Sequence, residues 1–346
     1  MEYQVQQGIV MNLKQVAALA GVSVSTVSRV LNGKSYVNAE TREIVMKAIR
    51  QTNYQPNALA QSLKMGRSNT ICLMIPSIEN MMFPKLTRGV EDIARKNGLT
   101  VFLCNTDEDA AVEKAYIETM KMRWIDGFIV CSIASDAPHI RSLRTEGYPL
   151  VLVNRFEASD IGKVDTVATD NYQIGYDATQ YLIRTGHKRI AIAYGRDELL
   201  LYRERRRGYL QALTDNGLPC PEAYTMRETN GNNGFYYQTK ELMGLDNPPD
   251  AIFCSSDPKA FVVMHALHDL GLRIPEDVAV IGVDNVSMAS MVEPPLTTIS
   301  QHLYRMGAAA ANSLIRQIEY KEKNGVLPKP ERTIFSSDLI VRRSTN

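Results

Sequence analysis

Apolar residues recur with a helical spacing in the first part of the chain. Three segments of this kind, LKQVAALA, VSTVSRVL and AETREIVMKAIRQ, follow one another between Asn12 and about Asn53. Asn12 can cap the first segment, and Gly21 ends it because glycine readily adopts the left-handed conformation that closes a helix. The pattern therefore predicts a small all-α unit of three short helices.

From Thr70 onward, short apolar runs alternate with amphipathic segments. The runs include TICLMIP, TVFLCN, GFIVCSI, PLVLVN, RIAIAYG, AIFCSS and VAVIGVD, and the segments between them have helical spacing. Such alternation is typical of a parallel sheet flanked by helices. Roughly ten strands are too many for one simple doubly wound sheet, so we expect an α/β core of two lobes, each with a mostly parallel sheet.

Proline, glycine and small polar residues mark the expected boundaries. Residues 1–11 have neither helix caps nor periodicity and are interpreted as a loose N-terminal extension. The helical head then covers 12–55. The segment PNALAQSLKMGRSN, residues 56–69, is interpreted as a linker with weak helical content, and the core covers 70–343.

Positive charge is concentrated in the head. Residues 1–68 hold eight Lys or Arg and three Asp or Glu, a net charge of +5, whereas the whole chain carries only +1. The remainder is therefore close to −4. A module that neutralises phosphates needs local rather than total charge, so this asymmetry favours a polyanion-binding head on a sensor.

The cysteines and the hydropathy pattern indicate a cytoplasmic protein. Four of the five cysteines lie in apolar runs and are expected to be small core residues, and there is no CxxC pair or secretory leader. No apolar run approaches the ~20 residues that span a bilayer. We expect a cytoplasmic location, with association with the nucleoid if the polyanion that the head binds is DNA.

The second predicted helix has an outer face that suits the major groove of DNA. Arg29 can make a bidentate contact with guanine, and Val24 can pack on a thymine methyl group. The remaining hydroxyl groups can bind phosphates or base edges near the start of the helix. The predicted DNA-reading residues of this helix are Val24, Ser25, Thr26, Ser28 and Arg29.

The segment VAALAGVSVSTVSRVLNG resembles the helix-turn-helix head of the lactose/galactose repressor (LacI/GalR) family of bacterial transcription regulators. YQPNALAQSLK resembles the hinge helix of that family, which orders on operator DNA. The resemblance implies that Leu63 inserts as a wedge into the minor groove and that Asn57 and Lys64 contact DNA. Because two hinges meet at one kink, it also implies a homodimer on a near-palindrome with a flexible central CG step.

The resemblance extends from Asn12 to about Arg343 through GHKRIAIAYG, RRRGYLQAL, PDAIFCSSD, RIPEDVAVIGVDN and PPLTTIS. It implies a core like that of periplasmic sugar-binding proteins. One lobe would comprise about 70–169 and 297–328, and the other 170–296 and 329–343. A small-molecule effector would lie in the cleft between them, at the strand ends.

The resemblance also implies a set of effector-binding residues. Asp284 and Arg205 match the most regular contacts, because a carboxylate accepts paired hydroxyls and a guanidinium donates a fork of hydrogen bonds. Additional arginines at 203, 206 and 207 favour a sugar acid or sugar phosphate over a neutral sugar. The weaker assignments, on expected strand ends and the first lobe, are Phe83, Asn154, Arg155, Asn230 and Ser256.

The expected function is transcriptional repression controlled allosterically. Effector binding would change the closure and twist of the lobes and hence the spacing of the two hinge helices. The missing leucine-heptad tail after TIFSSDLIV predicts a dimer rather than a tetramer.

Chemistry other than binding has little support. The sequence has no GxSxG, no phosphate-cradling GKS or GKT, and no nucleophile paired with a base, so no enzyme activity and no cofactor are expected. His265, His268 and Asp269 have a spacing that can hold a metal, but their apolar helix favours a core or surface pair.

Two alternatives remain open. The catabolite control branch of the family is governed by a serine-phosphorylated phosphocarrier protein, which needs a basic patch, yet Glu293 lies where basic residues are expected. The other alternative treats the core as a stand-alone sugar-binding protein or enzyme with an incidental head, although the lack of a signal peptide opposes a transport role.

Overall fold

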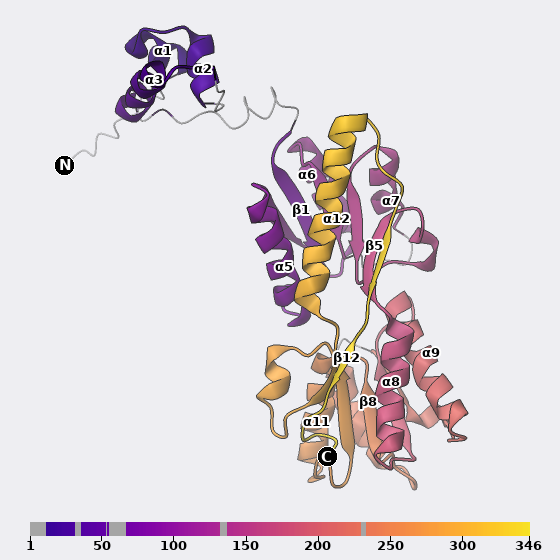
Figure 1. The fold of residues 1–346 in the computed structure, drawn as a ribbon. Coiled ribbons are helices and arrows are strands. Elements are labelled where there is room, and N and C mark those ends of the chain that lie inside the picture. The colour runs from indigo at the N-terminus through magenta and orange to yellow at the C-terminus, as the bar shows by residue number, and fades with distance from the viewer. Residues whose placement is uncertain (1–11, 32–35, 53, 55–66, 132–136, 230–232) are drawn as a thin grey trace, which may run out of the picture. The chain divides into compact units, whose positions relative to one another are not determined.

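The computed structural model describes residues 12–31, 36–52, 54, 67–131, 137–229 and 233–346. The chain divides into two compact units, Met1–Ser68 and Asn69–Asn346. The first is all-α within its described residues, and the second is α/β (Figure 1). The expected fold class is thereby confirmed.

The head contains the three predicted helices: α1 (Leu13–Ala20), α2 (Val24–Leu31) and α3 (Ala39–Thr52). Asn12 caps α1 in a reciprocal capping box with Gln15, and Gly21 closes that helix at a φ of 61°. Asn38 caps α3 by accepting a hydrogen bond from the backbone N–H of Thr41 at 2.8 Å. The helices share a core of small apolar residues: Val16, Ala17, Ala20, Val27, Val30, Val45 and Ala48.

The core contains two six-stranded sheets. In the first sheet the strand order is β11, β5, β4, β3, β1, β2, and all its pairings are parallel. Its strands are β1 (Thr70–Ile75), β2 (Thr100–Asn105), β3 (Gly127–Val130), β4 (Leu150–Val153), β5 (Asp165–Thr169) and β11 (Arg332–Phe335).

The second sheet has the order β12, β10, β9, β8, β6, β7, and only β12 runs antiparallel. Its strands are β6 (Ile190–Tyr194), β7 (Thr225–Arg227), β8 (Ala251–Cys254), β9 (Ala279–Val283), β10 (Thr297–Ser300) and β12 (Asp338–Ile340). The expected two mostly parallel sheets are therefore present.

Helices cover both faces of each sheet. In the first lobe, α5 (Met82–Lys96) and α12 (Leu303–Asn324) cover one face, and α6 (Ala110–Met122) and α7 (Pro138–Thr145) the other. In the second lobe, α8 (Asn171–Arg184) and α9 (Leu200–Asp215) lie opposite α10 (Gly234–Met243) and α11 (Asp257–Asp269).

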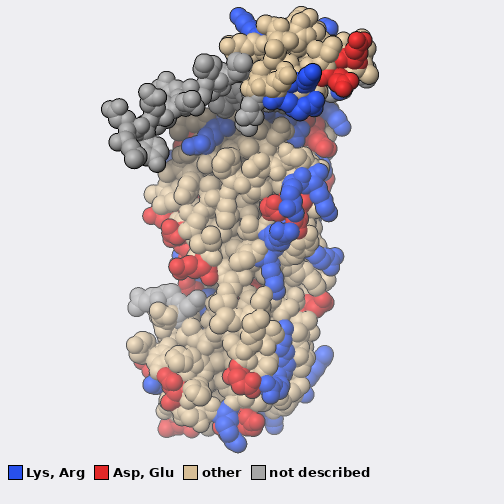
Figure 2. Space-filling view, turned by 90° about the vertical axis from the view of Figure 1, so that its left-hand side faces the viewer, with Lys and Arg blue, Asp and Glu red and all other residues tan. Residues whose placement is uncertain are grey.

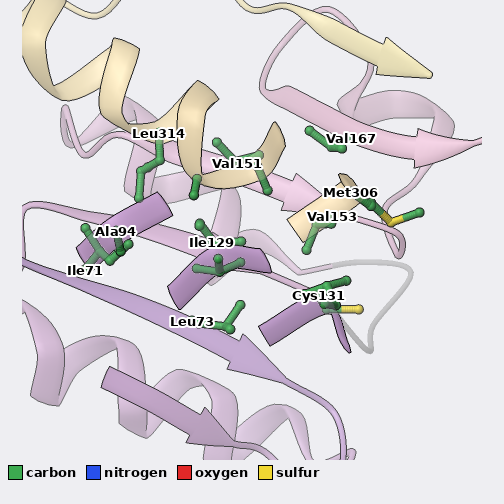
Figure 3. Packing of buried hydrophobic residues seen from close by; sticks show 14 of the residues in the cluster. Ile71, Leu73, Ala94, Ile129, Cys131, Val151, Val153, Val167, Met306 and Leu314 are labelled. Carbon is green, nitrogen blue, oxygen red and sulfur yellow. The ribbon is translucent and has the colours of Figure 1, made fainter. Parts of the chain in front are cut away.

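Alternation along each strand supplies both faces of its sheet. In β1, Ile71 and Leu73 pack under α5 and α12, whereas Cys72 and Met74 pack on the opposite side. Figure 3 shows the first of these clusters, with strand residues facing Ala94 of α5 and residues of α12. Because both faces of the central strands β1, β3, β4, β8 and β9 are covered, most of their successive residues are apolar and buried, and these runs are continuous in the sequence.

The chain crosses between the lobes three times, after β5, after β10 and after β11. The expected lobe limits need correction at two places. Residues 297–300 form β10, which pairs with β9 in the second lobe, and residues 332–335 form β11, which pairs with β5 in the first. The apolar run TIFSSDLIV looks like one strand but is divided between two sheets, because a hydrophobic pattern does not encode the partner strand.

Glycines allow close helix pairs in both lobes. A Cβ on Gly307 of α12 would lie 2.0 Å from the Leu86 carbonyl oxygen of α5, and one on Gly89 would lie 2.1 Å from that of Tyr304. In the second lobe, a Cβ on Gly175 of α8 would lie 1.9 Å from the carbonyl oxygen of Arg205 on α9. The absence of these side chains therefore fixes where α9 and its Arg205 lie.

We expect Gly307→Ala to destabilise the core, because the new methyl group collides with backbone rather than with a side chain that can move. Forced overpacking costs about 1–3 kcal/mol, which should appear as a lower urea midpoint for the core. Gly244→Ala is the control, since its Cβ would meet nothing closer than 3.4 Å. An equal midpoint for both variants would contradict the close-packing account.

Candidate functional site

The outer face of α2 carries the predicted DNA-reading residues. Val24, Ser25 and Arg29 are exposed, whereas Thr26 and Ser28 are half-buried. Val27 and Val30 on the opposite face are buried in the core of the head. The face therefore presents short side chains and one arginine, a combination that lets a helix backbone approach base edges closely.

Ser23 holds the start of this helix, a role the sequence analysis did not assign. Its hydroxyl oxygen accepts a hydrogen bond from the backbone N–H of Thr26 at 3.1 Å and contacts the Thr26 and Ser25 hydroxyls at 2.9 and 2.7 Å. The Thr26 hydroxyl is thus hydrogen-bonded to the hydroxyl of the capping residue Ser23. A Ser directly before a helical run was the signal available in the sequence.

Four predicted site residues lie outside the described residues: Asn57, Leu63, Lys64 and Asn230. Their assigned roles remain predictions.

A cavity of about 600 Å³ lies between the two lobes of the core. Segments that follow β1, β2 and β4 contribute from the first lobe, and segments that follow β6, β7 and β8 contribute from the second. This position agrees with the rule that parallel sheets bind ligands beyond the carboxyl ends of their strands. The lining residues are Ser77, Glu79, Asn80, Met81, Asp107, Glu108, Arg155, Arg196, Leu199, Tyr202, Glu228, Ser256, Pro258 and Lys259.

Two of the predicted effector residues, Arg155 and Ser256, line this cavity. Arg205 does not line it; its side chain is buried in the second lobe. The Arg205 guanidinium donates to the side-chain oxygen of Asn171 at 2.9 Å and to the carbonyl oxygen of Ser255 at 2.5 Å. Arg205 is therefore a buried cation with protein partners, not an exposed one on the helix surface.

Asp284 is buried at the end of β9 with a φ of 120°. Gln301 donates to its carboxylate at 2.5 Å, and Gln301 in turn accepts from the Thr169 hydroxyl at 2.8 Å. Burial raises the pKa of Asp284 to about 6, although the positive charge of Arg205 opposes this change. Gln301 and Thr169 belong to two of the crossings, so Asp284 is hydrogen-bonded to the connections between the lobes.

Asn154 and Phe83 are also buried. Phe83 packs in the apolar core of the first lobe and does not line the cavity. Asn154 has a φ of 63°, and its side-chain oxygen accepts no hydrogen bond. The Ser255 hydroxyl is likewise buried without a partner. Such groups cost free energy unless a ligand or water satisfies them, which is typical of a polar ligand site.

The structure adds a charged network that the sequence analysis missed. Arg155 donates to Glu108 at 3.0 Å, and Arg196 from the other lobe lies 2.8 Å from the second oxygen of that carboxylate. Lys259 forms an ion pair with Glu228 at 3.0 Å. Burial alone would raise the pKa of Glu108, but Arg155 and Arg196 outweigh burial and hold that pKa below its ordinary value.

The additional arginines of α9 do not supply this network. Arg203 pairs with Glu157 and Arg207 with Glu204, while Arg206 lies over the Tyr194 ring. None of these arginines lines the cavity. Their presence beside Arg205 in the sequence is therefore not a reason to expect an anionic ligand, because consecutive helix residues point in different directions.

A metal site and a membrane span have no support in the described part of the chain. No group of three potential metal ligands occurs there. His265 and Asp269 are 4.0 Å apart, and the His265 ring lies against that of Tyr236. None of the described helices has the length and hydropathy needed to cross a membrane.

Charges on the visible face of the core are mixed in sign. Figure 2 shows Lys and Arg beside Asp and Glu along its margins, with a broad uncharged area between them. This face therefore shows no surface of a single sign.

Two family models cover most of the chain. Residues 12–57 match the model of bacterial regulatory proteins of the lacI family, and residues 68–336 match that of periplasmic binding proteins and the sugar-binding domain of the LacI family. The first match lies within the first structural unit, and the second begins at residue 68, at the boundary between the two units.

Full-length regulators are similar to this chain. Catabolite control protein A of Priestia megaterium is 33% identical over 92% of this chain and 96% of its own length. The ribose operon repressor of Halalkalibacterium halodurans is 36% identical over 96% of both chains. The lac repressor dimer bound to operator and the anti-inducer ONPF superposes with a TM-score of 0.84 at 25% identity, covering 97% of this chain and 99% of that one. The chain therefore belongs to the LacI family of bacterial transcription regulators.

Proposed function

We propose that this protein is a repressor that binds a near-palindromic operator as a homodimer and is controlled by a neutral sugar between its lobes. The observation that carries the proposal is the cavity of about 600 Å³ that both lobes line with polar and charged side chains. The similarity to the lac repressor dimer on its operator supports the dimer and the DNA.

The chemistry of the cavity favours a neutral ligand over an acid. Its cations already have carboxylate partners: Arg155 and Arg196 share Glu108, and Lys259 has Glu228. An acidic effector would have to break these ion pairs. Sugar hydroxyls can instead donate to carboxylates and accept from amide and guanidinium groups without changing the charge balance.

Control of DNA binding would arise from lobe closure. Three polar contacts join the first lobe to the second. They are the ion pairs Glu108–Arg196 and Glu157–Arg203, and the hydrogen bond from Lys85 to the Asn285 carbonyl oxygen. An effector that binds one arrangement of these contacts better than another shifts the population of lobe arrangements. A hundredfold change in operator affinity needs about 2.7 kcal/mol of differential binding, which a few hydrogen bonds provide.

We infer that the cavity binds its ligand without transforming it and that the protein acts at chromosomal DNA in the cytoplasm. The relatives are regulators, and no role in this proposal requires a nucleophile or a cofactor.

Operator selection from random duplexes at a stated salt concentration should enrich a palindrome. Arg29→Ala should weaken operator binding. It should also reduce the discrimination between bases at one position of each half-site by about 1–3 kcal/mol, because a bidentate guanine contact is lost. Leu63→Ala should weaken binding to a flexible central step. Arg50→Ala, in the last turn of α3, removes the same charge elsewhere and should leave the base preference unchanged. An unchanged consensus with Arg29→Ala would refute its role in base reading.

Neutral monosaccharides and disaccharides should be screened for a change in operator affinity. For the sugar that responds, affinity should fall as the pH drops from 7 to 5, because the pKa of Asp284 is about 6 and its protonation weakens the hydrogen bond from Gln301 at a connection between the lobes. Asp284→Asn should weaken binding at least tenfold and remove this pH dependence. Asp277→Asn, which removes a surface ion pair with Arg273, is the control.

Operator DNA must shift the affinity of that sugar by the same factor as the sugar shifts operator affinity. Calorimetry that finds no such reciprocity would refute the allosteric proposal.

A second candidate is control by a phosphorylated protein, which the similarity to catabolite control protein A favours. Against it, Glu293 stands where a basic residue is expected and pairs with Arg343 at 2.8 Å. We expect a pull-down with the serine-phosphorylated phosphocarrier to recover no complex. Stoichiometric capture that Glu293→Lys strengthens would favour this candidate instead.

A further inference from the structure

Glu108 lies in the cavity where two guanidinium groups from different lobes converge. One carboxylate oxygen accepts from Arg155 at 3.0 Å, and the other lies 2.8 Å from Arg196. The Arg155 side chain is almost fully buried, with 6% exposed. Two arginines around one carboxylate form the arrangement that proteins use to bind the phosphate or carboxylate group of a ligand.

The backbone holds this carboxylate in place. Asp107 and Glu108 both have positive φ, 51° and 58°, which non-glycine residues adopt at a cost in free energy. The turn is fixed at each end, because the Glu108 N–H donates to the Pro76 carbonyl oxygen at 3.0 Å and Asp109 caps α6. Glu108 is thus presented to the arginines by a strained and anchored turn, not by a freely moving loop.

We propose that Glu108 determines the specificity of the cavity by acting as an internal anion. Its carboxylate takes the place that a phosphate or carboxylate group of a ligand would occupy between Arg155 and Arg196. Anionic sugars are therefore excluded by competition and by like-charge repulsion, whereas neutral sugars are admitted. This inference rests on the proposed function, in which the cavity is the effector site.

The low pKa of Glu108 is consistent with this role, since the group stays ionised throughout the physiological range. Neutralising it would leave two arginines without an anion in a partly buried site. Such a site should then attract an anion from solution, and the size of that gain measures how strongly Glu108 excludes anions in the native protein.

The test is binding of inorganic phosphate to the full-length protein by calorimetry, at low ionic strength and pH 7.5. Glu108→Gln keeps the shape of the side chain and removes its charge. We expect it to bind phosphate at least tenfold more tightly than the native protein. Glu222→Gln is the matched control, because Glu222 pairs with Arg227 outside the cavity and its loss should produce no gain. Phosphate that binds to the head would add the same heat signal for every variant, because the head is unchanged in all of them.

The double variant Glu108→Gln/Arg196→Gln should lose the gain, which would place the bound phosphate between the arginines. The inference is overturned if Glu108→Gln binds phosphate no better than Glu222→Gln, or if the gain survives in the double variant. It is also overturned if the native protein binds phosphate in the millimolar range and Arg196→Gln abolishes that binding, a measurement that does not require Glu108→Gln to fold.

Failure of this inference is distinguishable from failure of the proposed function. Phosphate binding reports on the charges around Glu108 whether or not a sugar regulates the protein. Conversely, a neutral sugar that changes operator affinity supports the proposed function even if Glu108→Gln gains no phosphate.

Discussion

The structure depends on burying charged side chains where the carboxyl ends of two parallel sheets face each other. Arg205, Asp284, Arg155 and Lys259 are each at least nine-tenths buried. Charges removed from water are tolerated only when partners compensate for the lost hydration. Here the partners come from separate segments of the chain, such as Gln301 for Asp284 and Glu108 for Arg155. The buried polar layer therefore couples the position of one lobe to that of the other.

The polar layer also contacts two of the three crossings of the chain between the lobes. A single connection would leave the lobes free to rotate, whereas three parallel connections restrict their motion to closure and twist. The crossings also carry part of the polar layer, because Thr169 ends one strand before its crossing and Gln301 follows β10. A ligand that rearranges this layer acts directly on the connections that set lobe geometry.

Closely packed helix pairs in both lobes fix the position of this buried polar layer. Gly175 and Gly208 let α8 and α9 approach until backbone meets backbone, and Arg205 lies on the α9 side of that contact. Gly89 and Gly307 do the same for α5 and α12 in the first lobe. Close backbone packing leaves little room for these helices to slide past one another.

The sequence by itself determined the local structure and the family. The bounds of the three head helices followed almost without error from the cap at Asn12, the stop at Gly21 and the helical spacing. Caps and periodicity are readable in the sequence because they act between near neighbours. Continuous apolar runs gave the doubly covered sheets. The α2 pattern gave the outer face of that helix, which carries the predicted DNA-reading residues, because exposure on a helix follows from spacing.

Only the tertiary structure decided which distant residues meet. It assigned β10 and β11 to lobes opposite to those expected, since strand pairing is a contact between residues far apart in the sequence. It buried Arg205 and turned the neighbouring arginines of α9 away from the cavity. It also brought Glu108 between Arg155 and Arg196, from three segments that no local pattern connects. The sequence gives the sign of each charge. The fold determines which oppositely charged residue lies beside it, because such partners are far apart in the sequence.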